Sequence, residues 1–250
     1  MLQRYFLEIA FKGTEFHGWQ IQPGVVTVQS IIEAALEQVL RVKTAVMGCG
    51  RTDTGVHATQ FFLHFENNGE EILGEGLVRS LNGVLHPDIA VKRLIPVGEK
   101  THARFDAKER EYQYYVHENK DPFLAGRSLM LFHQLDIKEM NKAAALLLGK
   151  QDFSSFCRTG SDVKTHLCDV RRAEWKEEND RYTFTIIADR FLRNMVRAIV
   201  GTLIDVGAGR MSIEQFKEVI EAQDRTKASK SALACGLYLT RVEYPFLQTE

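Results

Sequence analysis

Cysteines are few in this sequence, and their spacing matches no metal site or disulfide framework. The 250 residues contain four cysteines, which lie far apart and form no CxxC motif. Structural zinc sites and disulfide frameworks both need cysteines at short, regular spacings. The sequence therefore indicates neither, and it predicts reduced thiols, which are typical of a cytoplasmic protein. The four residues are Cys49, Cys157, Cys168 and Cys235.

Long apolar runs are also absent. No stretch approaches the roughly 18 residues of a membrane-spanning helix. The N-terminal letters MLQRYFLEIAFKG alternate like a β-strand and lack the apolar block of a signal peptide. We therefore expect a cytoplasmic protein without a membrane partner. Hydrophobic residues make up 44% of the chain, enough for a sizeable core, and the length suits one large domain or two smaller ones.

An excess of positive charge, common in nucleic-acid-binding proteins, is missing. Lysine and arginine number 32, aspartate and glutamate 33, and the formal net charge is −1. Basic residues nevertheless concentrate in three segments, 100–110, 158–172 and 190–197. Since a neutral total can hide a basic groove, two interpretations stay open: solvated faces, or a basic surface for an anionic partner.

Motifs for nucleotide cofactors and metals are missing as well. The sequence has no glycine-rich phosphate-binding loop, and no two histidines have the spacing of a zinc protease. It therefore predicts neither a cofactor nor a metal.

The sequence does contain a repeated order of secondary structure. Alternation and helical spacing of apolar residues predict strand, helix, two strands, helix and strand in each half. The expected elements of the first half are 5–11, 28–40, 45–49, 57–65, 77–85 and 89–97. Those of the second half are 111–117, 136–148, 167–177, 182–188, 192–206 and 237–244, with an extra helix at 212–222 and a capping pair, Asp136 and Glu139.

This order predicts the fold class. The arrangement βαββαβ is ferredoxin-like, so we expect an α+β protein of two ferredoxin-like (RRM-like) halves. Each half should have a mainly antiparallel sheet with helices packed on one face, and a cleft should lie between the halves. No linker-like segment separates them, and we place the boundary near residue 105, giving domains 1–105 and 106–250.

The segment GCGRTDTGVHATQ, residues 48–60, falls in the central hairpin loop of the first half. Asp, Thr and Gly are common turn formers, so an ordinary turn is one interpretation. An aspartic protease motif is a second interpretation, but that mechanism needs two Asp-Thr-Gly copies sharing one proton, and the chain has one. Arg51 would also favour the ionised carboxylate of Asp53. A third interpretation is that Asp53 is presented to a substrate, while His57 is more simply a structural residue.

The wider stretch GRTDTGVHA resembles the motif of the tRNA pseudouridine synthase A (TruA) family. Similar segments follow along essentially the whole chain, and their combination is highly specific. They are FKGTEFHGWQIQ, the VQ at 28–29, HARFDAKEREYQYYV, DFSSFC, FLRNMVRAIVGTL and GLYLTRVEYP. One departure concerns the loop 231–235, which lacks the proline that the family usually has before its closing Gly-Leu. The contacts of this loop are therefore in question.

The resemblance implies an isomerase that converts uridine to pseudouridine at positions 38–40, in the anticodon stem-loop of tRNA, as a homodimer without a cofactor or metal. It implies that Asp53 is the catalytic nucleophile and that Tyr112 stacks on the flipped uracil. Arg51 would help to hold the opened RNA. Arg197 would lie beside the catalytic aspartate and keep it ionised, which joins the two halves. Tyr114 is expected to pack in the core.

One feature supports Arg197 independently of the resemblance. Arg190, Arg193 and Arg197 should lie on one face near the start of the predicted helix 192–206. Cations there are disfavoured by about 0.3–1 kcal/mol each, so three arginines suggest a bound anion; a solvated basic face is the plain alternative. For the whole chain, the alternative to a synthase is a non-catalytic RNA-binding protein of the same fold.

Overall fold

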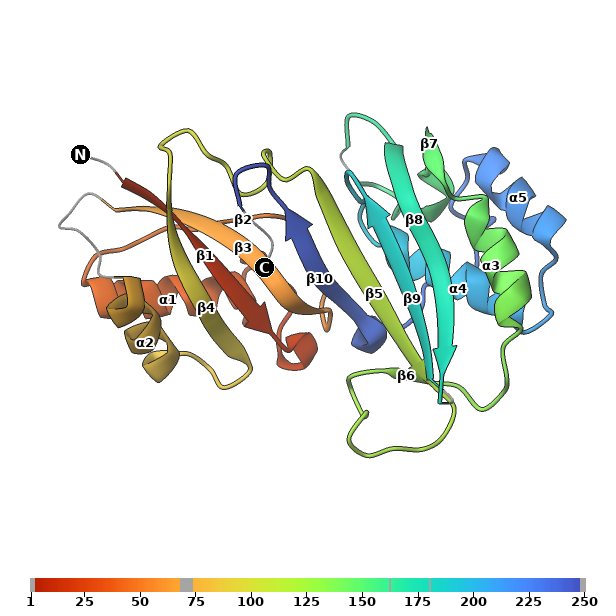
Figure 1. Ribbon diagram of the computed structural model, residues 1–250, viewed down its shortest axis with the longest axis horizontal. Helices are drawn as coiled ribbons and strands as arrows, with labels where there is room; N and C mark the ends of the chain where they lie inside the picture. The colour runs from red at the N-terminus through yellow and green to blue at the C-terminus, as the bar shows by residue number, and fades with distance from the viewer. Residues whose placement is uncertain (1–2, 68–73, 162, 180, 248–250) are drawn as a thin grey trace. The chain divides into compact units, whose positions relative to one another are not determined.

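The computed structural model describes residues 3–67, 74–161, 163–179 and 181–247 (Figure 1). Contacts between residues divide the chain into two compact units. The first unit comprises Met1–Lys108 and Tyr238–Glu250, and the second comprises Glu109–Leu237. The closing strand, which the sequence-based division places in the second half, therefore groups with the first unit.

The first unit has the predicted βαββαβ order. Its elements are β1 (Gln3–Phe11), α1 (Val28–Leu40), β2 (Met47–Gly48), β3 (His57–Asn67), α2 (Gly74–Val84) and β4 (Ile89–Val97). The strands lie in the order β4–β1–β3, and β1 is antiparallel to both neighbours. At one end of β3, residues 63 and 64 pair with β2; at the other, residues 57 and 58 pair in parallel with β10 (Leu237–Glu243).

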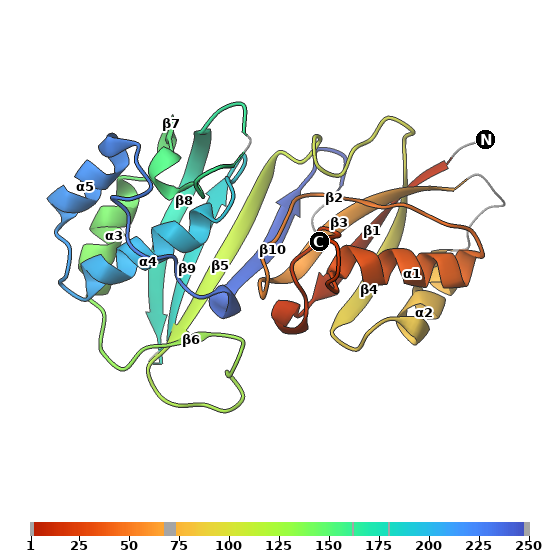
Figure 2. The same cartoon turned by 180° about the vertical axis from the view of Figure 1, so that it is seen from behind.

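The sheet of the first unit is buried on both faces because β1 carries large apolar residues on both. Tyr5, Leu7 and Ile9 alternate on one face and are almost inaccessible, and so is Phe6 on the other. Figure 2 shows α1 and α2 covering one face of this sheet. The ring of Phe6 packs edge-on against Tyr244, 5.3 Å away. The segment after β10 therefore contributes to the core of the first unit.

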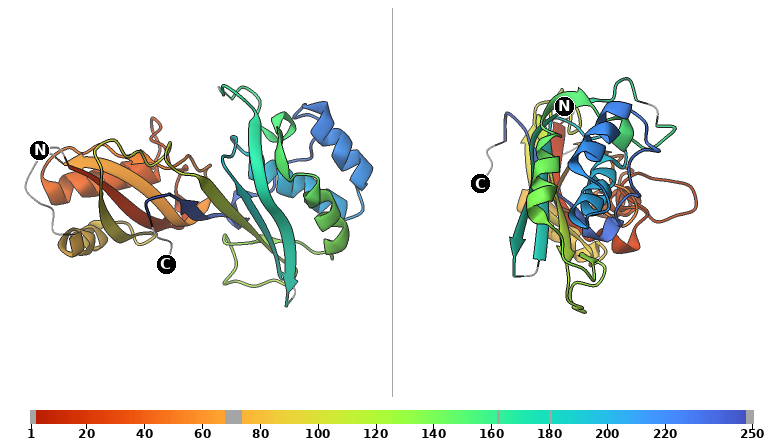
Figure 3. Two further views of the ribbon diagram at one scale, coloured as in Figure 1. Left: turned by 45° about the horizontal axis from the view of Figure 1, so that its top comes forward. Right: turned by 90° about the vertical axis from the view of Figure 1, so that its right-hand side faces the viewer.

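The second unit consists of β5 (Glu109–His117), β6 (Leu129–Met130), α3 (Ile137–Ala145), β7 (Gly149–Asp152), β8 (Leu167–Glu178), β9 (Arg181–Ala188), α4 (Met195–Gly207) and α5 (Ile213–Ala222). Its strands lie in the order β5–β9–β8–β7 with antiparallel neighbours, and β6 adds in parallel to β5. The three helices lie on one side of these strands (Figure 2; Figure 3, right). The α+β class with helices on one face is thus confirmed for each unit.

The second unit agrees with the sequence-based expectation in one detail, the cap of α3, and differs from it in two, the end of α3 and two short strands. Asp136 caps α3 as predicted, since its Oδ1 accepts a hydrogen bond from the backbone N–H of Glu139 at 3.0 Å. The helix, however, ends at Ala145, and residues 149–152 form β7, which pairs with β8. The short strands β6 and β7 were not expected, because strands of two to four residues leave too little alternation to recognise.

Candidate active site

Asp53 lies on the loop between β2 and β3, and backbone hydrogen bonds join this loop to the N-terminal segment. The carbonyl oxygen of Thr52 accepts from the N–H of Trp19 at 3.3 Å, and the N–H of Gly55 donates to the carbonyl of Phe16 at 3.3 Å. These bonds flank Asp53 on both sides. The position of its backbone is therefore fixed by the fold and does not depend on the turn alone.

Glycines allow the two segments to approach so closely. A Cβ atom on Gly13 would lie 1.9 Å from the carbonyl oxygen of Val56, and one on Gly18 would lie 2.4 Å from that of Thr52. Gly18 also has a φ of +81°, a conformation that disfavours side chains. The Nδ1 atom of His57 accepts a 3.0 Å bond from the N–H of Gly13. His57 thus serves the structure, as the sequence suggested.

The three central residues of the loop differ in exposure. Arg51 is exposed, Thr52 is buried and Asp53 is half-buried. A half-buried carboxylate on a fixed loop can react with a group brought to the surface, while an exposed guanidinium beside it can bind phosphate or stack on a base. Asp53 and Arg51 therefore lie on the same loop of the first unit.

Tyr112 lies on β5 of the second unit, where it pairs with Ile186 of β9. Its ring is half-buried and meets the ring of Phe191 edge-on, with centroids 5.1 Å apart and an interplanar angle of 87°. Tyr114, two residues along the same face of the strand, is fully buried and donates its hydroxyl to the carbonyl of Leu233 at 2.8 Å. Tyr114 is therefore a core residue, as expected.

Arg197 lies in the first turn of α4 and is held by the loop 231–235. Its Nε donates to the carbonyl of Ala232 at 2.8 Å, and the N–H of Ala232 donates back to the carbonyl of Arg197 at 2.9 Å. Burial raises the pKa of the Tyr114 hydroxyl far above its ordinary value, and the nearby Arg197 charge partly opposes this rise. Since Tyr112 shares the strand face of Tyr114, Arg197 and Tyr112 belong to one region of the second unit.

The loop 231–235 is fixed by hydrogen bonds, although it lacks the proline expected for the family. The Oγ atom of Ser231 accepts from Nδ2 of Asn194 at 2.6 Å and from a terminal nitrogen of Arg225 at 3.0 Å. Leu233 accepts from the hydroxyl of Tyr114 at 2.8 Å. These side-chain contacts and the Arg197 pair fix the loop in the absence of a proline.

Gly201 lets the segment 230–235, called the strap from here on, approach α4 closely, because a Cβ atom at Gly201 would lie 2.0 Å from the carbonyl oxygen of Lys230. We expect Gly201→Ala to displace the strap and to lower the unfolding free energy by about 1–3 kcal/mol. Chemical denaturation measures this loss. The matched control is Gly83→Ala in α2, where no atom lies within 4 Å of the added carbon; it should not destabilise. Equal stability of the Gly201→Ala variant and wild type would contradict the packing argument.

The expected cluster of three arginines on one helix face is wrong. α4 begins at Met195, and its N-cap Asn194 has a left-handed φ of 65°, which asparagine tolerates and which interrupts the helix. Arg190 and Arg193 precede this break and lie outside the helix. Arg197 is therefore the member of the set that α4 itself positions.

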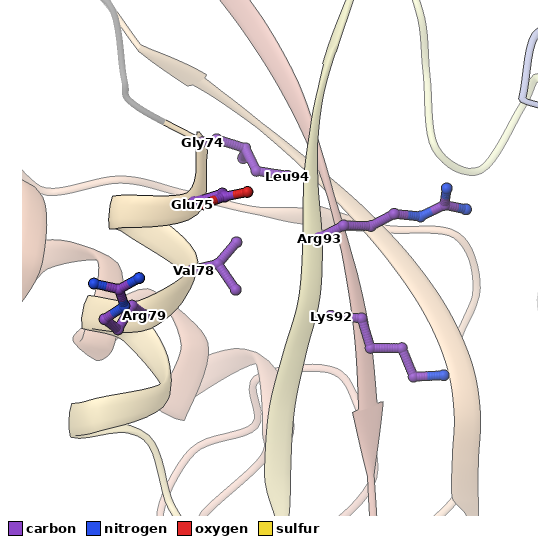
Figure 4. Close-up of a pocket in the computed structure, with 7 residues that line it drawn as sticks. All are labelled: Gly74, Glu75, Val78, Arg79, Lys92, Arg93 and Leu94. Atoms are coloured by element: carbon purple, nitrogen blue, oxygen red, sulfur yellow. The ribbon is translucent and has the colours of Figure 1, made fainter.

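A pocket of about 470 Å³ lies between α2 and β4, and none of the predicted site residues lines it (Figure 4). Val78 points from α2 toward β4, whereas Lys92 and Arg93 extend to the other side of β4. Arg93 forms an ion pair with Glu8 at 2.5 Å, and Nζ of Lys92 donates to the carbonyl of Thr59 at 2.7 Å. Lys92 and Arg93 are thus engaged in the fold, while Glu75 and Arg79 of α2, which also line the pocket, are exposed.

A metal-binding cluster and a membrane-spanning helix are both absent from the described ranges. Among residues 3–67, 74–161, 163–179 and 181–247, no three His, Cys, Asp or Glu residues are grouped so that they could hold a metal ion. Within the same ranges, none of the helices combines the length and apolar character needed to cross a bilayer. The four cysteines are free thiols.

Comparison with known proteins first defines the class. A family model described as tRNA pseudouridine synthase matches residues 143–245. The protein "tRNA pseudouridine synthase A" of Bacteroides fragilis is 47% identical over 246 residues, covering 98% of this chain and 97% of the relative. The proteins of that name from Parabacteroides distasonis and Neisseria meningitidis serogroup B are 48% and 40% identical, covering 98% and 97% of this chain and 97% and 92% of their own lengths.

This chain therefore belongs to the tRNA pseudouridine synthase family, whose members are isomerases. The resemblance read from the sequence motifs is confirmed. Asp53 and Arg51 lie in the first unit and Tyr112 and Arg197 in the second, and their roles remain predictions.

Proposed function

We propose that this protein isomerises uridine to pseudouridine in tRNA. The N1–C1′ glycosidic bond breaks, the uracil turns, and a C5–C1′ bond forms, so the reaction needs no oxidant or reductant. The observation that carries the proposal is the identity of 47–48% with named synthases over nearly the whole chain. The resemblance of the motifs further suggests uridines of the anticodon stem-loop as targets, a homodimer as the active form, and the cytoplasm, where tRNA is modified, as the location.

In this proposal Asp53 is the nucleophile. A carboxylate must be ionised to attack, and a half-buried site with a fixed backbone can limit water without fully desolvating the charge. Arg197 is proposed to support that ionised state and to bind substrate. A guanidinium oriented by a backbone carbonyl is well suited to this, because the bond to Ala232 uses Nε and holds the planar group in one orientation.

The target uridine has to leave the RNA stack before it can react. Extrusion of a base costs a few kcal/mol, which stacking and hydrogen bonds in the enzyme offset. We propose that the half-buried ring of Tyr112, oriented by Phe191, stacks on the uracil. The exposed Arg51 would hold the opened RNA, since a guanidinium can both stack and bind phosphate.

The proposal is tested with an unmodified tRNA transcript that carries tritium at C5 of uracil. Formation of pseudouridine releases this tritium to water, so purified protein should release it and the Asp53→Ala variant should not. Sequencing of the modified positions then tests the anticodon stem-loop. Retained tRNA binding without any release would support a non-catalytic RNA-binding protein instead.

Tyr112→Ala is expected to weaken binding of the flipped uridine and to lower kcat/KM roughly 5- to 150-fold, which corresponds to the loss of one base–aromatic stack. Tyr112→Phe should retain most activity because it keeps the ring. Steady-state tritium release measures both. Tyr115→Ala is the matched control, since Tyr115 is also half-buried on β5 but points to the opposite face. Similar losses for positions 112 and 115 would point to damage of the strand and against stacking.

A further inference from the structure

Phe105 is an aromatic side chain that the fold presents to solvent. It lies on the loop 102–106 of the first unit and is 73% exposed, while the neighbouring Ala103 is completely buried. An isolated exposed apolar residue needs no explanation. What distinguishes Phe105 is the number of bonds that hold the surrounding loop.

Hydrogen bonds within the loop fix its conformation. The N–H of His102 donates to Oδ2 of Asp106 at 2.8 Å, and the N–H of Asp106 donates to the carbonyl of His102 at 3.1 Å. The Nδ1 atom of His102 accepts from the N–H of Arg104 at 3.0 Å. The phenylalanine is therefore carried by a closed turn and needs little further ordering when it binds a partner.

Two further bonds anchor the turn to the body of the first unit. Nδ1 of His64 accepts from the N–H of Ala103 at 3.1 Å, and the hydroxyl of Tyr244 donates to the carbonyl of Ala103 at 2.5 Å. Burial, together with the charge of Arg4 and the nearby His102, lowers the pKa of His64 to about 4. His64 thus stays neutral near neutral pH and keeps the lone pair that this bond requires.

The ring itself is held in one orientation beside a guanidinium. It lies against the imidazole of His102, with centroids 4.3 Å apart and an interplanar angle of 35°. The guanidinium carbon of Arg104 is 5.7 Å from the ring centroid. Lys100 and Lys108, on either side of the turn, are exposed. An oriented aromatic ring beside a guanidinium matches what an unpaired nucleotide offers, a base to stack and a phosphate to neutralise.

We propose that Phe105 is a stacking platform for an unpaired base of the tRNA substrate and that Arg104 binds the adjoining phosphate. This inference rests on the proposed function, because it takes tRNA as the ligand. Phe105 supplies affinity and placement of the RNA, and the bond-breaking chemistry belongs to the residues already described. The two exposed lysines add to the sequence-independent attraction of the phosphate backbone.

The test compares tRNA binding by wild type, Phe105→Ala, Phe105→Trp and the control Phe123→Ala. Phe123 is also highly exposed, at 81%, on a loop of the second unit. In filter binding with an unmodified transcript, Phe105→Ala should weaken affinity roughly 5- to 150-fold, the range for one stacked base. Phe105→Trp should bind like wild type, and so should Phe123→Ala. In turnover assays Phe105→Ala should raise KM far more than it lowers kcat.

The tryptophan variant also reports stacking directly. The two natural tryptophans, Trp19 and Trp175, are each 3% exposed, so an indole at position 105 would supply a distinct, solvent-exposed fluorescence. Addition of tRNA should quench this component. Arg104→Gln should reduce the slope of log affinity against log salt concentration by about 0.7, the value for one phosphate contact on a single strand.

Three outcomes would overturn the inference. One is unchanged affinity of Phe105→Ala together with an unquenched Phe105→Trp. Another is a change in the oligomeric state of Phe105→Ala, measured by light scattering, while the assembled variant binds tRNA as tightly as wild type. That result would assign the ring to contact with a second copy of the chain. The third is an equal loss in Phe123→Ala. Tritium release by wild type is measured separately. If tRNA binding depended on Phe105 but wild type released no tritium, the proposed function would be refuted and the stacking role of Phe105 would still hold.

Discussion

Asp53→Asn is expected to abolish tritium release from C5-labelled tRNA, with a loss of at least about 10⁴-fold, as for removal of a catalytic nucleophile. The amide has nearly the shape of the carboxylate, but it carries no charge and is a poor nucleophile. Because the backbone around position 53 is fixed by bonds of Thr52 and Gly55, the loop should keep its form. Affinity for tRNA in filter binding should therefore stay close to that of wild type.

The control for this substitution is Asp88→Asn. Asp88 is likewise half-buried in the first unit, and its side chain pairs with Lys12 at 3.8 Å, a contact of small energetic value. It should retain wild-type turnover. If Asp53→Asn released tritium as fast as wild type, Asp53 would not be the nucleophile, and the loop would be the ordinary turn that its composition also allows.

Much of the first unit could be predicted because its signals lie in side chains. Alternating apolar residues in β1 and the helical spacing in α1 produce the expected elements, and the glycine-flanked Asp53 falls on the loop where the hairpin pattern places it. The role of Gly13 and Gly18 was less accessible. These two positions must be glycine because their backbones contact Thr52 and Val56, about 35 to 45 positions away. No local sequence pattern encodes such a contact.

The surroundings of Arg197 could not be predicted for a related reason. Its partner is the backbone carbonyl of Ala232, and Tyr114 bonds the carbonyl of Leu233. Every residue carries a carbonyl, so the letters Ala and Leu contain no sign of this role. The start of α4 was also misplaced, because a left-handed Asn194 is a conformational choice that the helical spacing from Leu192 onward does not reveal. The apolar spacing was right and the boundary was wrong.

These observations change how the basic segment 190–197 should be interpreted. The sequence offered three arginines on a helix as one anion site. In the structure Arg193 is exposed before the helix, whereas Arg197 is half-buried and bonded in both directions to the strap. A cation in the first turn of a helix opposes the helix dipole, and burying part of it adds a desolvation cost. These two costs are the ones that the proposed anion-binding role of Arg197 would offset, and they do not apply to the exposed Arg193.

Arg197→Met should accordingly lower turnover by about 10²–10³-fold, the range for removal of one oriented charge-stabilising group. Methionine fills a similar apolar volume but cannot hold an anion. If Arg197 keeps the nucleophilic carboxylate ionised, as the family resemblance implies, the acidic limb of the pH–rate profile should also move to higher pH. Tritium release from saturating tRNA, measured across pH, gives both results.

Arg193→Met is the matched control, since it removes the same charge four residues earlier from an exposed position. It should leave turnover and the pH profile unchanged and at most weaken binding of tRNA in a salt-dependent way. An Arg197→Met variant with a large loss of turnover but an unaltered pH profile would show that this arginine binds the substrate and does not act on the nucleophile. If Arg197→Met and Arg193→Met both lowered turnover only slightly and equally, Arg197 would not belong to the active site. Its bonds to Ala232 would then serve only to hold the strap against α4.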